Sequence, residues 1–280
     1  MTMMYVTLNN GVKMPCLGLG TYPMNGDTLT KVAKEAIEVG YRSFDTATAY
    51  KNEDYLGNAL QEAMLGGISR TDLFITTKVS NKWQRDGDIR KTLLASLKRL
   101  HLDYVDLYLM HWPNPETFVD TWGKMEELYH EGKARAIGVS NFHEHHLQSL
   151  LKRSSLVPAV NQVELHPLLN QSKLVNYCAS LGIRMVSYSP LARMDERLIK
   201  HPVLQKIAER HKKSVPQVIL RWNIQLGYAV IPKTENSERL RANLDLFDFK
   251  LTDDEIKNIN KINEDYRVRF NPDTCDYSKL

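Results

Sequence analysis

The chain has 280 residues, a formal net charge of +4 and 42% hydrophobic residues. It is long enough to bury a large core, and its Lys and Arg residues form no basic run, which argues against a nucleic-acid partner. No apolar stretch approaches the roughly 20 residues of a bilayer-spanning helix, and the N-terminus lacks the basic start and apolar centre of a signal peptide. We therefore expect a cytoplasmic protein with no membrane partner.

Cysteine and histidine content gives little indication of a metal site. The three cysteines are widely spaced and form no Cys-x-x-Cys pair, so neither a disulfide framework nor a cysteine zinc site is indicated. His143, His145 and His146 lie close together in sequence, but no carboxylate or further ligand is prescribed nearby. We predict that the chain has no metal site.

The first predicted element is a hairpin within residues 1–15. Two short β-prone segments, 5–8 and 12–14, flank the sequence Asn9-Asn10-Gly11, which is typical of a tight hairpin turn. This two-stranded unit precedes the first strand of the main sheet. If that sheet closes into a barrel, the hairpin most simply covers its floor.

Apolar runs with the composition of strands then recur along the chain, and stretches with helical spacing separate them. The predicted strands are residues 16–21, 42–47, 73–79, 105–112, 135–141, 159–166, 184–191 and 228–233. The predicted helices that follow them are residues 28–39, 54–64, 89–100, 118–129, 145–151, 172–181, 215–225 and 238–246. Eight strands, each followed by a helix, predict an α/β fold of the (β/α)8 TIM barrel type.

An open doubly wound sheet is the alternative fold, but its usual glycine-rich loop is missing, because Pro23 takes the last Gly position of a GxGxxG pattern. Two further helices are predicted outside the repeat, at 202–211 and from Thr252 to near Ile262. The tail, residues 265–280, is polar and irregular. No linker divides the chain, so we predict one domain over residues 1–280.

Three predicted strands end on an ionisable residue at an equal interval. Asp45, Lys78 and His111 are each 33 residues apart, which is about one strand, one helix and two loops. Equal steps deliver an acid, an amine and an imidazole to the same ends of neighbouring strands, and Tyr50 follows Asp45 closely enough to return over that rim. Four titratable groups at one barrel mouth predict proton chemistry. A Schiff-base aldolase, with Lys78 as the nucleophile, is one such chemistry.

Three longer segments stand out: GYRSFDTATAYKNE at 40–53, GKARAIGVSNF at 132–142 and IPKTENSER at 231–239. They resemble signatures of the aldo-keto reductase family. NQVELHP at 161–167 and SYSPL at 187–191 are further matches, and the resemblance covers essentially the whole chain. It implies a barrel that binds NADPH across its C-terminal rim and reduces aldehydes, ketones or dicarbonyls. An NADPH-binding regulatory or redox-sensing subunit with little turnover is the alternative.

The resemblance also implies catalytic roles. Tyr50 is similar to the family's general acid, and we expect the ammonium of Lys78 to lower the pKa of this phenol. Asp45 would keep Lys78 charged, because a buried ammonium without a counter-ion tends to deprotonate. His111, as a neutral ring, would orient the substrate carbonyl.

Cofactor and substrate contacts carry over from the resemblance in the same way. Ser140, Asn141 and Gln162 match the trio that grips the nicotinamide carboxamide, and Tyr188 matches the ring that stacks on it. Lys233, Thr234 and Arg239 match the cluster around the 2′-phosphate, which favours NADPH over NADH. The remaining cofactor candidates are Gly20, Thr21, Asp45, Ser189, Leu191 and Asn243.

The predicted substrate wall is aromatic, with Tyr22, Trp83 and Trp112 placed beside Tyr50 and His111. Residues 79–87 depart from the family's common pattern in this wall, and the tail after residue 265 is short. We therefore expect an open, shallow pocket for small aldehydes and dicarbonyls. We expect a monomer, with a weak dimer left open.

Overall fold

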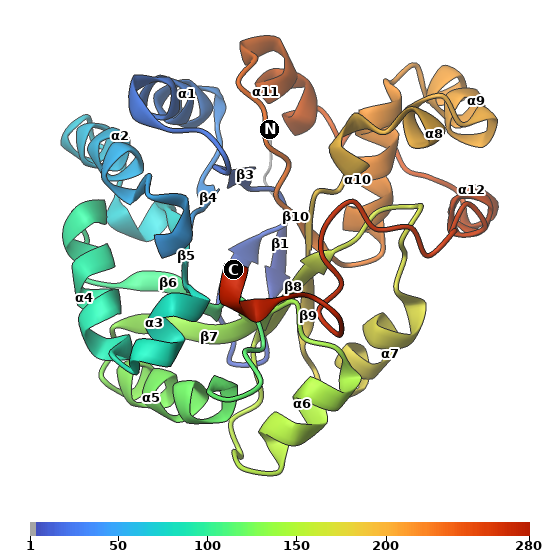
Figure 1. Cartoon of the computed structure of the whole chain (residues 1–280). Coiled ribbons are helices and arrows are strands. Elements are labelled where there is room, and N and C mark those ends of the chain that lie inside the picture. Colours follow the sequence, from blue (N-terminus) through green and yellow to red (C-terminus); the bar gives the residue numbers. More distant parts are fainter. Residues whose placement is uncertain (1–3) are drawn as a thin grey trace.

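A computed structural model describes residues 4–280, and its central feature is a parallel sheet of eight strands (Figure 1). The strands are β3 (Leu19–Gly20), β4 (Ser43–Asp45), β5 (Phe74–Val79), β6 (Val105–Met110), β7 (Ala134–Ser140), β8 (Val160–Glu164), β9 (Arg184–Tyr188) and β10 (Ala229–Val230). Each strand pairs in parallel with the next one along the chain. A parallel bridge between Leu17 and Val230 joins the two edges. The predicted (β/α)8 barrel is confirmed.

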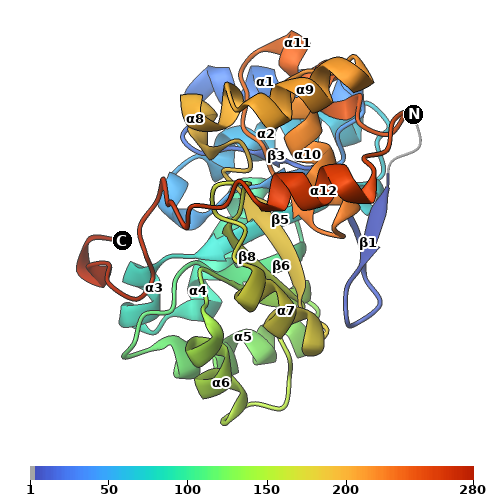
Figure 2. The ribbon, with the colours of Figure 1, turned by 90° about the vertical axis from the view of Figure 1, so that its right-hand side faces the viewer.

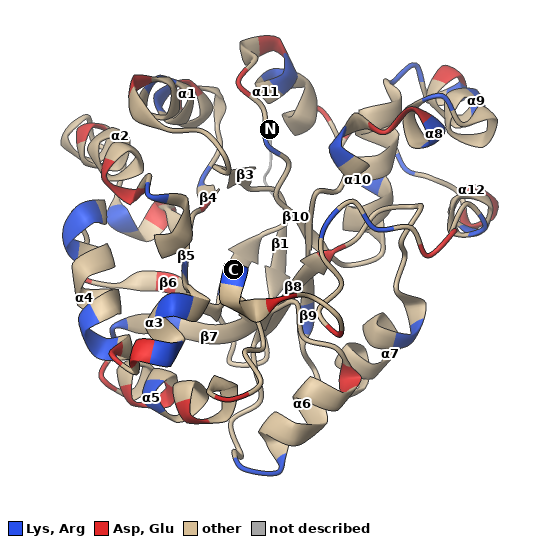
Figure 3. Ribbon diagram, viewed as in Figure 1, with Lys and Arg blue, Asp and Glu red and all other residues tan. Residues whose placement is uncertain are grey.

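Helices surround the sheet on the outside, as the two views show (Figures 1 and 2). Those that follow the strands are α1 (Gly26–Val39), α2 (Glu53–Leu65), α4 (Ile89–Leu100), α5 (Phe118–His130), α6 (Glu144–Leu151), α7 (Ser172–Ser180), α10 (Val215–Gln225) and α11 (Ser237–Leu244). In α1 the buried residues recur every three or four positions, which presents one apolar stripe to the sheet. Charged residues of both signs are distributed over the outer helices (Figure 3).

The N-terminal hairpin is present and covers the barrel floor. Strands β1 (Tyr5–Thr7) and β2 (Lys13–Pro15) pair antiparallel, and the buried side chains of Leu8 and Met14 pack with apolar residues of the barrel interior. The side chain of Asn10 donates a hydrogen bond of 2.9 Å to the carbonyl of Arg135, at the start of β7. Residues 1–3 of the predicted hairpin lie outside the described residues.

The two extra helices are confirmed as α9 (Pro202–His211) and α12 (Asp253–Asn260). Thr252 and Glu255 form the reciprocal capping box expected at the start of α12, with hydrogen bonds of 2.8 and 3.2 Å. Two short helices that we did not predict, α3 (Asn81–Asp86) and α8 (Glu196–Ile199), lie in the loops after β5 and β9. In the described part of the chain, no helix is long and apolar enough to cross a membrane.

Strand ends at the C-terminal rim differ from the prediction. We extended the seventh strand to residue 191, but β9 ends at Tyr188 and Ser189 has a φ of +46°, which breaks the extended backbone. The tail after α12 is irregular as predicted, apart from a 3-10 turn at Tyr277–Lys279. It runs from α12 back to the centre of the barrel mouth (red in Figures 1 and 2).

Candidate active site

The barrel brings the four predicted catalytic residues to one end. Asp45 ends β4, Lys78 lies near the end of β5, His111 follows β6, and Tyr50 ends a 3-10 turn (Thr48–Tyr50) after β4. Asp45 pairs with Thr76, so Lys78 stands two positions beyond the level of Asp45. Because side chains alternate along a strand, an offset of two keeps both on the same face of the sheet. The interval of 33 residues therefore preserves the face as well as the strand end.

Lys78 and Asp45 form a buried ion pair. The Lys78 side chain is 0% exposed and its ammonium contacts Asp45 Oδ1, while it donates to the carbonyl of Thr46 at 2.9 Å and to the hydroxyl of Tyr50 at 3.4 Å. The second oxygen of Asp45 accepts a hydrogen bond of 2.7 Å from Gln162 Nε2. Burial lowers the pKa of Lys78, but Asp45 and Tyr50 outweigh that effect, so the pKa is raised and the amine stays charged.

This environment argues against the Schiff-base alternative. All three ammonium hydrogens of Lys78 have acceptors, and its side chain is absent from the lining of the cavity that contains Tyr50. A nucleophilic amine must be unprotonated and accessible to the substrate carbonyl. Lys78 is neither, so its place in the fold fits an electrostatic role.

Lys78 lowers the pKa of Tyr50 as expected, but the net shift is upward. Burial raises the pKa of this phenol, and the opposing effect of Lys78 does not overcome it. The phenol therefore keeps its proton at neutral pH. Lys78 remains the group that would stabilise the phenolate once the proton has left.

His111 is held as a neutral ring beside Tyr50. Burial, followed by the positive charges of Lys78 and Arg269, lowers its pKa well below the ordinary value of 6.5. The rings of Tyr50 and His111 meet edge to face, with centroids 5.5 Å apart. The side-chain amide of Asn141 donates a 2.9 Å hydrogen bond to the carbonyl of His111, which ties the end of β6 to that of β7.

Asp45, Tyr50 and His111 line one cavity of about 1020 Å³ at the barrel mouth. Every predicted cofactor candidate lines this cavity, from the end of β3 to the loop after β10 and helix α11. The lining includes Gly20, Thr21, Asp45, Ser140, Asn141, Gln162, Tyr188, Ser189, Leu191, Lys233, Thr234, Arg239 and Asn243. The structure thus brings together residues that are as far apart in the sequence as Gly20 and Asn243.

The predicted carboxamide trio forms a connected polar cluster. Ser140 donates to the carbonyl of Gln162 at 2.8 Å, and the hydroxyl of Tyr188 donates to Asn141 Oδ1 at 2.7 Å. Asn141 has a φ of +64°, a conformation that asparagine tolerates better than most residues. These contacts restrict the orientation of the Asn141 amide.

The opposite end of the cavity is basic. Lys233 and Thr234 lie in the loop after β10, and Arg239 lies in the first turns of α11, whose N-terminus is capped by Asn236. Lys233 is partly neutralised by Glu235 at 2.5 Å. A helix start with two cations and a hydroxyl is suited to a phosphate group.

The structure places two of the three predicted wall aromatics in the cavity lining. Tyr22 and Trp112 line the cavity with Tyr50 and His111, but Trp83 does not. The short helix α3 begins directly after β5 and presents Ser80 and Asn81 to the cavity instead. Trp83 packs against the core and under the ammonium of Lys82, 4.8 Å from its ring centre.

Sequence reasoning missed the contribution of the tail to this site. Arg269 lines the cavity, and Phe270 lies 6.5 Å from Trp112 between ring centroids. The tail has no regular pattern that predicts where it packs, so its place could not be inferred. The tail therefore forms part of the mouth that we expected to be open and shallow.

The histidine cluster beside α6 has a structural explanation. Asp273 supplies the nearby carboxylate that the sequence did not indicate, and it bonds His143 Nδ1 at 2.8 Å. The other ring nitrogen of His143 accepts from Arg267 at 3.1 Å, and His146 Nδ1 accepts the backbone N–H of His143 at 3.0 Å. These nitrogens are engaged in helix capping and in fixing the tail, so we interpret the cluster as a tail anchor.

Residues 16–264 match the family model described as the aldo/keto reductase family. The chain belongs to this family and is an oxidoreductase. Among aldo-keto reductase relatives, the chain is 49% identical to the glyoxal reductase of Bacillus subtilis over 272 residues, covering 96% of each chain. It is 42% identical to the methylglyoxal reductase DkgA of Escherichia coli K12, again covering 96% of each.

Solved aldo-keto reductases share the architecture. The chain superposes on the Bombyx mori enzyme, solved in complex with NADP, with a TM-score of 0.90 at 36% identity, covering 98% of this chain and 97% of that one. A metagenomic aldo-keto reductase from a Medee basin deep-sea library gives a TM-score of 0.93 at 39% identity, covering 97% of this chain and 100% of that one.

Proposed function

We propose that this aldo-keto reductase reduces small aldehydes, ketones or dicarbonyls to alcohols with NADPH. The observation that carries the proposal is the 3.4 Å contact between the hydroxyl of Tyr50 and the ion-paired ammonium of Lys78. Tyr50 itself lines a cavity that extends to Arg239. Relatives named for glyoxal and methylglyoxal reduction favour dicarbonyls as the substrate class.

The cavity lining fits the proposed cofactor. Ser140, Asn141 and Gln162 offer a preformed amide and hydroxyl set for a carboxamide, and Tyr188 offers an aromatic face. The basic end of the cavity, with Lys233, Thr234 and Arg239 in its lining, supports the assignment of a phosphate site there. NADPH, when bound, supplies a hydride to the carbonyl carbon.

This chain's own residues would manage the proton. Tyr50, protonated at neutral pH, would donate it to the carbonyl oxygen as negative charge develops there. The ammonium of Lys78 would stabilise the resulting phenolate, and Asp45 would keep that ammonium charged and oriented. His111, neutral because its pKa is low, would offer an N–H to the same oxygen.

The test is consumption of NADPH over a panel of carbonyl compounds by the wild type, Tyr50→Phe and Tyr22→Phe. Tyr22 is a matched control, because its ring lies 5.0 Å from that of Tyr50 but its hydroxyl has no proposed role. We expect Tyr50→Phe to lose about two to four orders of magnitude in kcat, whereas Tyr22→Phe stays within a few fold. Unchanged activity of Tyr50→Phe would remove the proposed acid. Tight NADPH binding with no oxidation by the wild type would favour the regulatory alternative.

A further inference from the structure

The turn that carries Tyr50 begins where the chain leaves β4. The N–H of Thr46, just past the end of β4, still donates to the carbonyl of Thr76 in β5 at 2.9 Å. Backbone donors on one side of a parallel strand recur every second residue, so the next donor would be the N–H of Thr48 and its acceptor the carbonyl of Lys78. The backbone instead enters a 3-10 turn at Thr48, and the extended pairing with β5 ends there.

The side chain of Thr48 continues the pairing that its backbone leaves. Its hydroxyl donates to the carbonyl of Lys78 at 3.0 Å and accepts the backbone N–H of Ser80 at 3.2 Å. A hydroxyl can fill both roles because it has one donor hydrogen and two acceptor lone pairs. The hydroxyl is in register with the ladder, because Thr48 and Lys78 each follow the preceding bonded pair by two residues. The turn is thereby tied to β5 at the residue that supplies the ammonium.

The position of the Tyr50 phenol depends on this turn. Its hydroxyl accepts a long hydrogen bond of 3.4 Å from Lys78, and its ring lies 5.0 Å from that of Tyr22, a side chain that is 46% exposed. Lys78 is held more firmly, since its ammonium contacts Asp45 and donates to the carbonyl of Thr46. A shift of the turn would therefore move the phenol relative to a fixed ammonium.

We propose that Thr48 is a positioning residue that sets the distance between the hydroxyl of Tyr50 and the ammonium of Lys78. The inference rests on the proposed function, since it concerns the same proton donor. The cavity lining includes Tyr50 and Ser80 but not Thr48, so Thr48 would act on the reaction through Tyr50. Proton donation depends steeply on geometry, and a displacement of about 1 Å can cost on the order of a hundredfold in rate.

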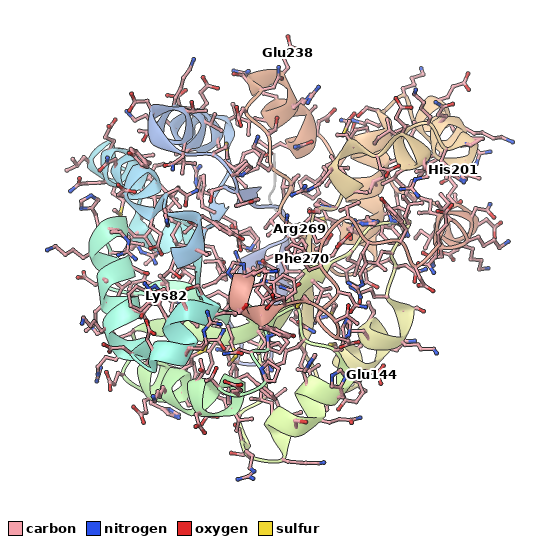
Figure 4. All side chains as sticks on the ribbon, viewed as in Figure 1. Lys82, Glu144, His201, Glu238, Arg269 and Phe270 are labelled. Carbon is pink, nitrogen blue, oxygen red and sulfur yellow. The ribbon has the colours of Figure 1, made fainter. Side chains whose placement is uncertain are left out.

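The bond from Ser80 gives the same hydroxyl a second possible effect. Ser80 precedes helix α3 and lines the cavity, and Figure 4 labels Lys82 on that helix beside the barrel mouth. Loss of the bond from Ser80 would alter the substrate wall and raise the KM for the carbonyl compound. Displacement of Tyr50 would lower the rate of the chemical step at unchanged KM. The split between rate and KM therefore tells the two effects apart.

The test measures single-turnover oxidation of enzyme-bound NADPH at varied concentrations of the most active compound of the carbonyl panel, so that release of NADP⁺ cannot mask the chemical step. Thr48→Val keeps the shape of the side chain and removes the hydroxyl, whereas Thr48→Ser keeps the hydroxyl. Thr30→Val is the matched control. The half-buried Thr30 donates a comparable hydrogen bond of 3.0 Å to the carbonyl of Tyr55, between α1 and α2.

We expect Thr48→Val to lower the single-turnover rate about tenfold while its KM stays within about threefold of the wild type. Thr48→Ser should stay within about threefold of the wild-type rate, and Thr30→Val within about twofold. A loss that appears in KM alone, an equal loss in Thr48→Ser, or no loss in Thr48→Val would overturn the inference. Thr48→Ala removes the same hydroxyl and replaces Thr48→Val in the comparison should that variant not fold.

Crystal structures separate this inference from the proposed function. The distance between Tyr50 Oη and Lys78 Nζ is 3.4 Å in the wild type. In Thr48→Val it should increase beyond about 3.6 Å, too long for a hydrogen bond, and Thr48→Ser should keep the wild-type distance. An unchanged distance in Thr48→Val counts against Thr48 whatever the turnover. Failure of the wild type to oxidise NADPH with any carbonyl compound would instead count against the reductase function.

Discussion

Replacement of Asp45 by Asn isolates the buried ion pair, because it removes the negative charge and keeps the size of the side chain. The side chains of Lys78 and Asp45 are 0% and 5% exposed, so water cannot solvate the ammonium that is left. Removing one partner of such a pair costs about 3–5 kcal/mol of folding free energy. The geometry adds to this cost, since the two oxygens of Asp45 accept from Lys78 and from Gln162, and Asn has only one oxygen.

Urea unfolding of the wild type, Asp45→Asn and the double variant with Lys78→Met measures this effect. In a thermal melt the same loss of unfolding free energy would appear as a lower Tm. The unfolding entropy of a chain of this size is on the order of 0.6 kcal/mol/K, so Tm should fall by roughly 5–9 °C. Met removes the uncompensated charge and keeps much of the volume, so the double variant should recover most of the stability. Wild-type stability of Asp45→Asn, or a double variant that is no more stable than the single one, would refute the reasoning.

Further predictions concern pH, cofactor and packing. Burial raises the pKa of Tyr50 above 10 and lowers the pKa of His111 below 6.5, so kcat/KM for carbonyl reduction should be independent of pH between these two values. It should fall at higher pH, where the phenol loses its proton, and at lower pH, where the imidazole gains one. A fall in kcat/KM centred near pH 8 would contradict this. Arg239→Ala should raise the KM for NADPH far more than that for NADH in steady-state assays, and equal effects would remove the phosphate assignment. Gly57→Ala should cost about 1–3 kcal/mol in urea unfolding, because the new Cβ meets the backbone of α4, whereas Gly123→Ala, in open space within α5, should stabilise by about 0.5–1 kcal/mol.

The sequence indicated the barrel, and the rim that gathers the candidate catalytic residues, because both depend on short-range periodicity. Strand and helix patterns repeat within windows of about ten residues, so their order is readable without knowledge of tertiary contacts. The equal spacing of Asp45, Lys78 and His111 indicated correctly that these side chains lie together. The reason is geometric, since an even offset between paired strands keeps side chains on one face of the sheet. Tyr50 could be added because it is only five residues from Asp45.

Features that depend on long-range packing could not be predicted in the same way. Trp83 was misplaced because a one-turn helix after β5 rotates it away from the cavity, and such a short helix has little sequence signal. The net pKa shift of Tyr50 was misjudged because burial is a property of the whole mouth, whereas the charge of Lys78 is visible in the sequence. Arg269 was missed because its position depends on Glu164, 105 residues earlier.

The two sets of contacts at the mouth are separable, and this has a consequence for selectivity. Asp45, Lys78 and Tyr50 are joined by hydrogen bonds within the rim of the barrel, whereas the backbone at Arg269 is tied to Glu164, outside that set. If the proposed function holds, a change in the tail should alter which carbonyl compounds bind while leaving Tyr50 and the ammonium of Lys78 in place. Variants of Asp45 should lower activity on every substrate, and variants of Arg269 should change the ranking of substrates.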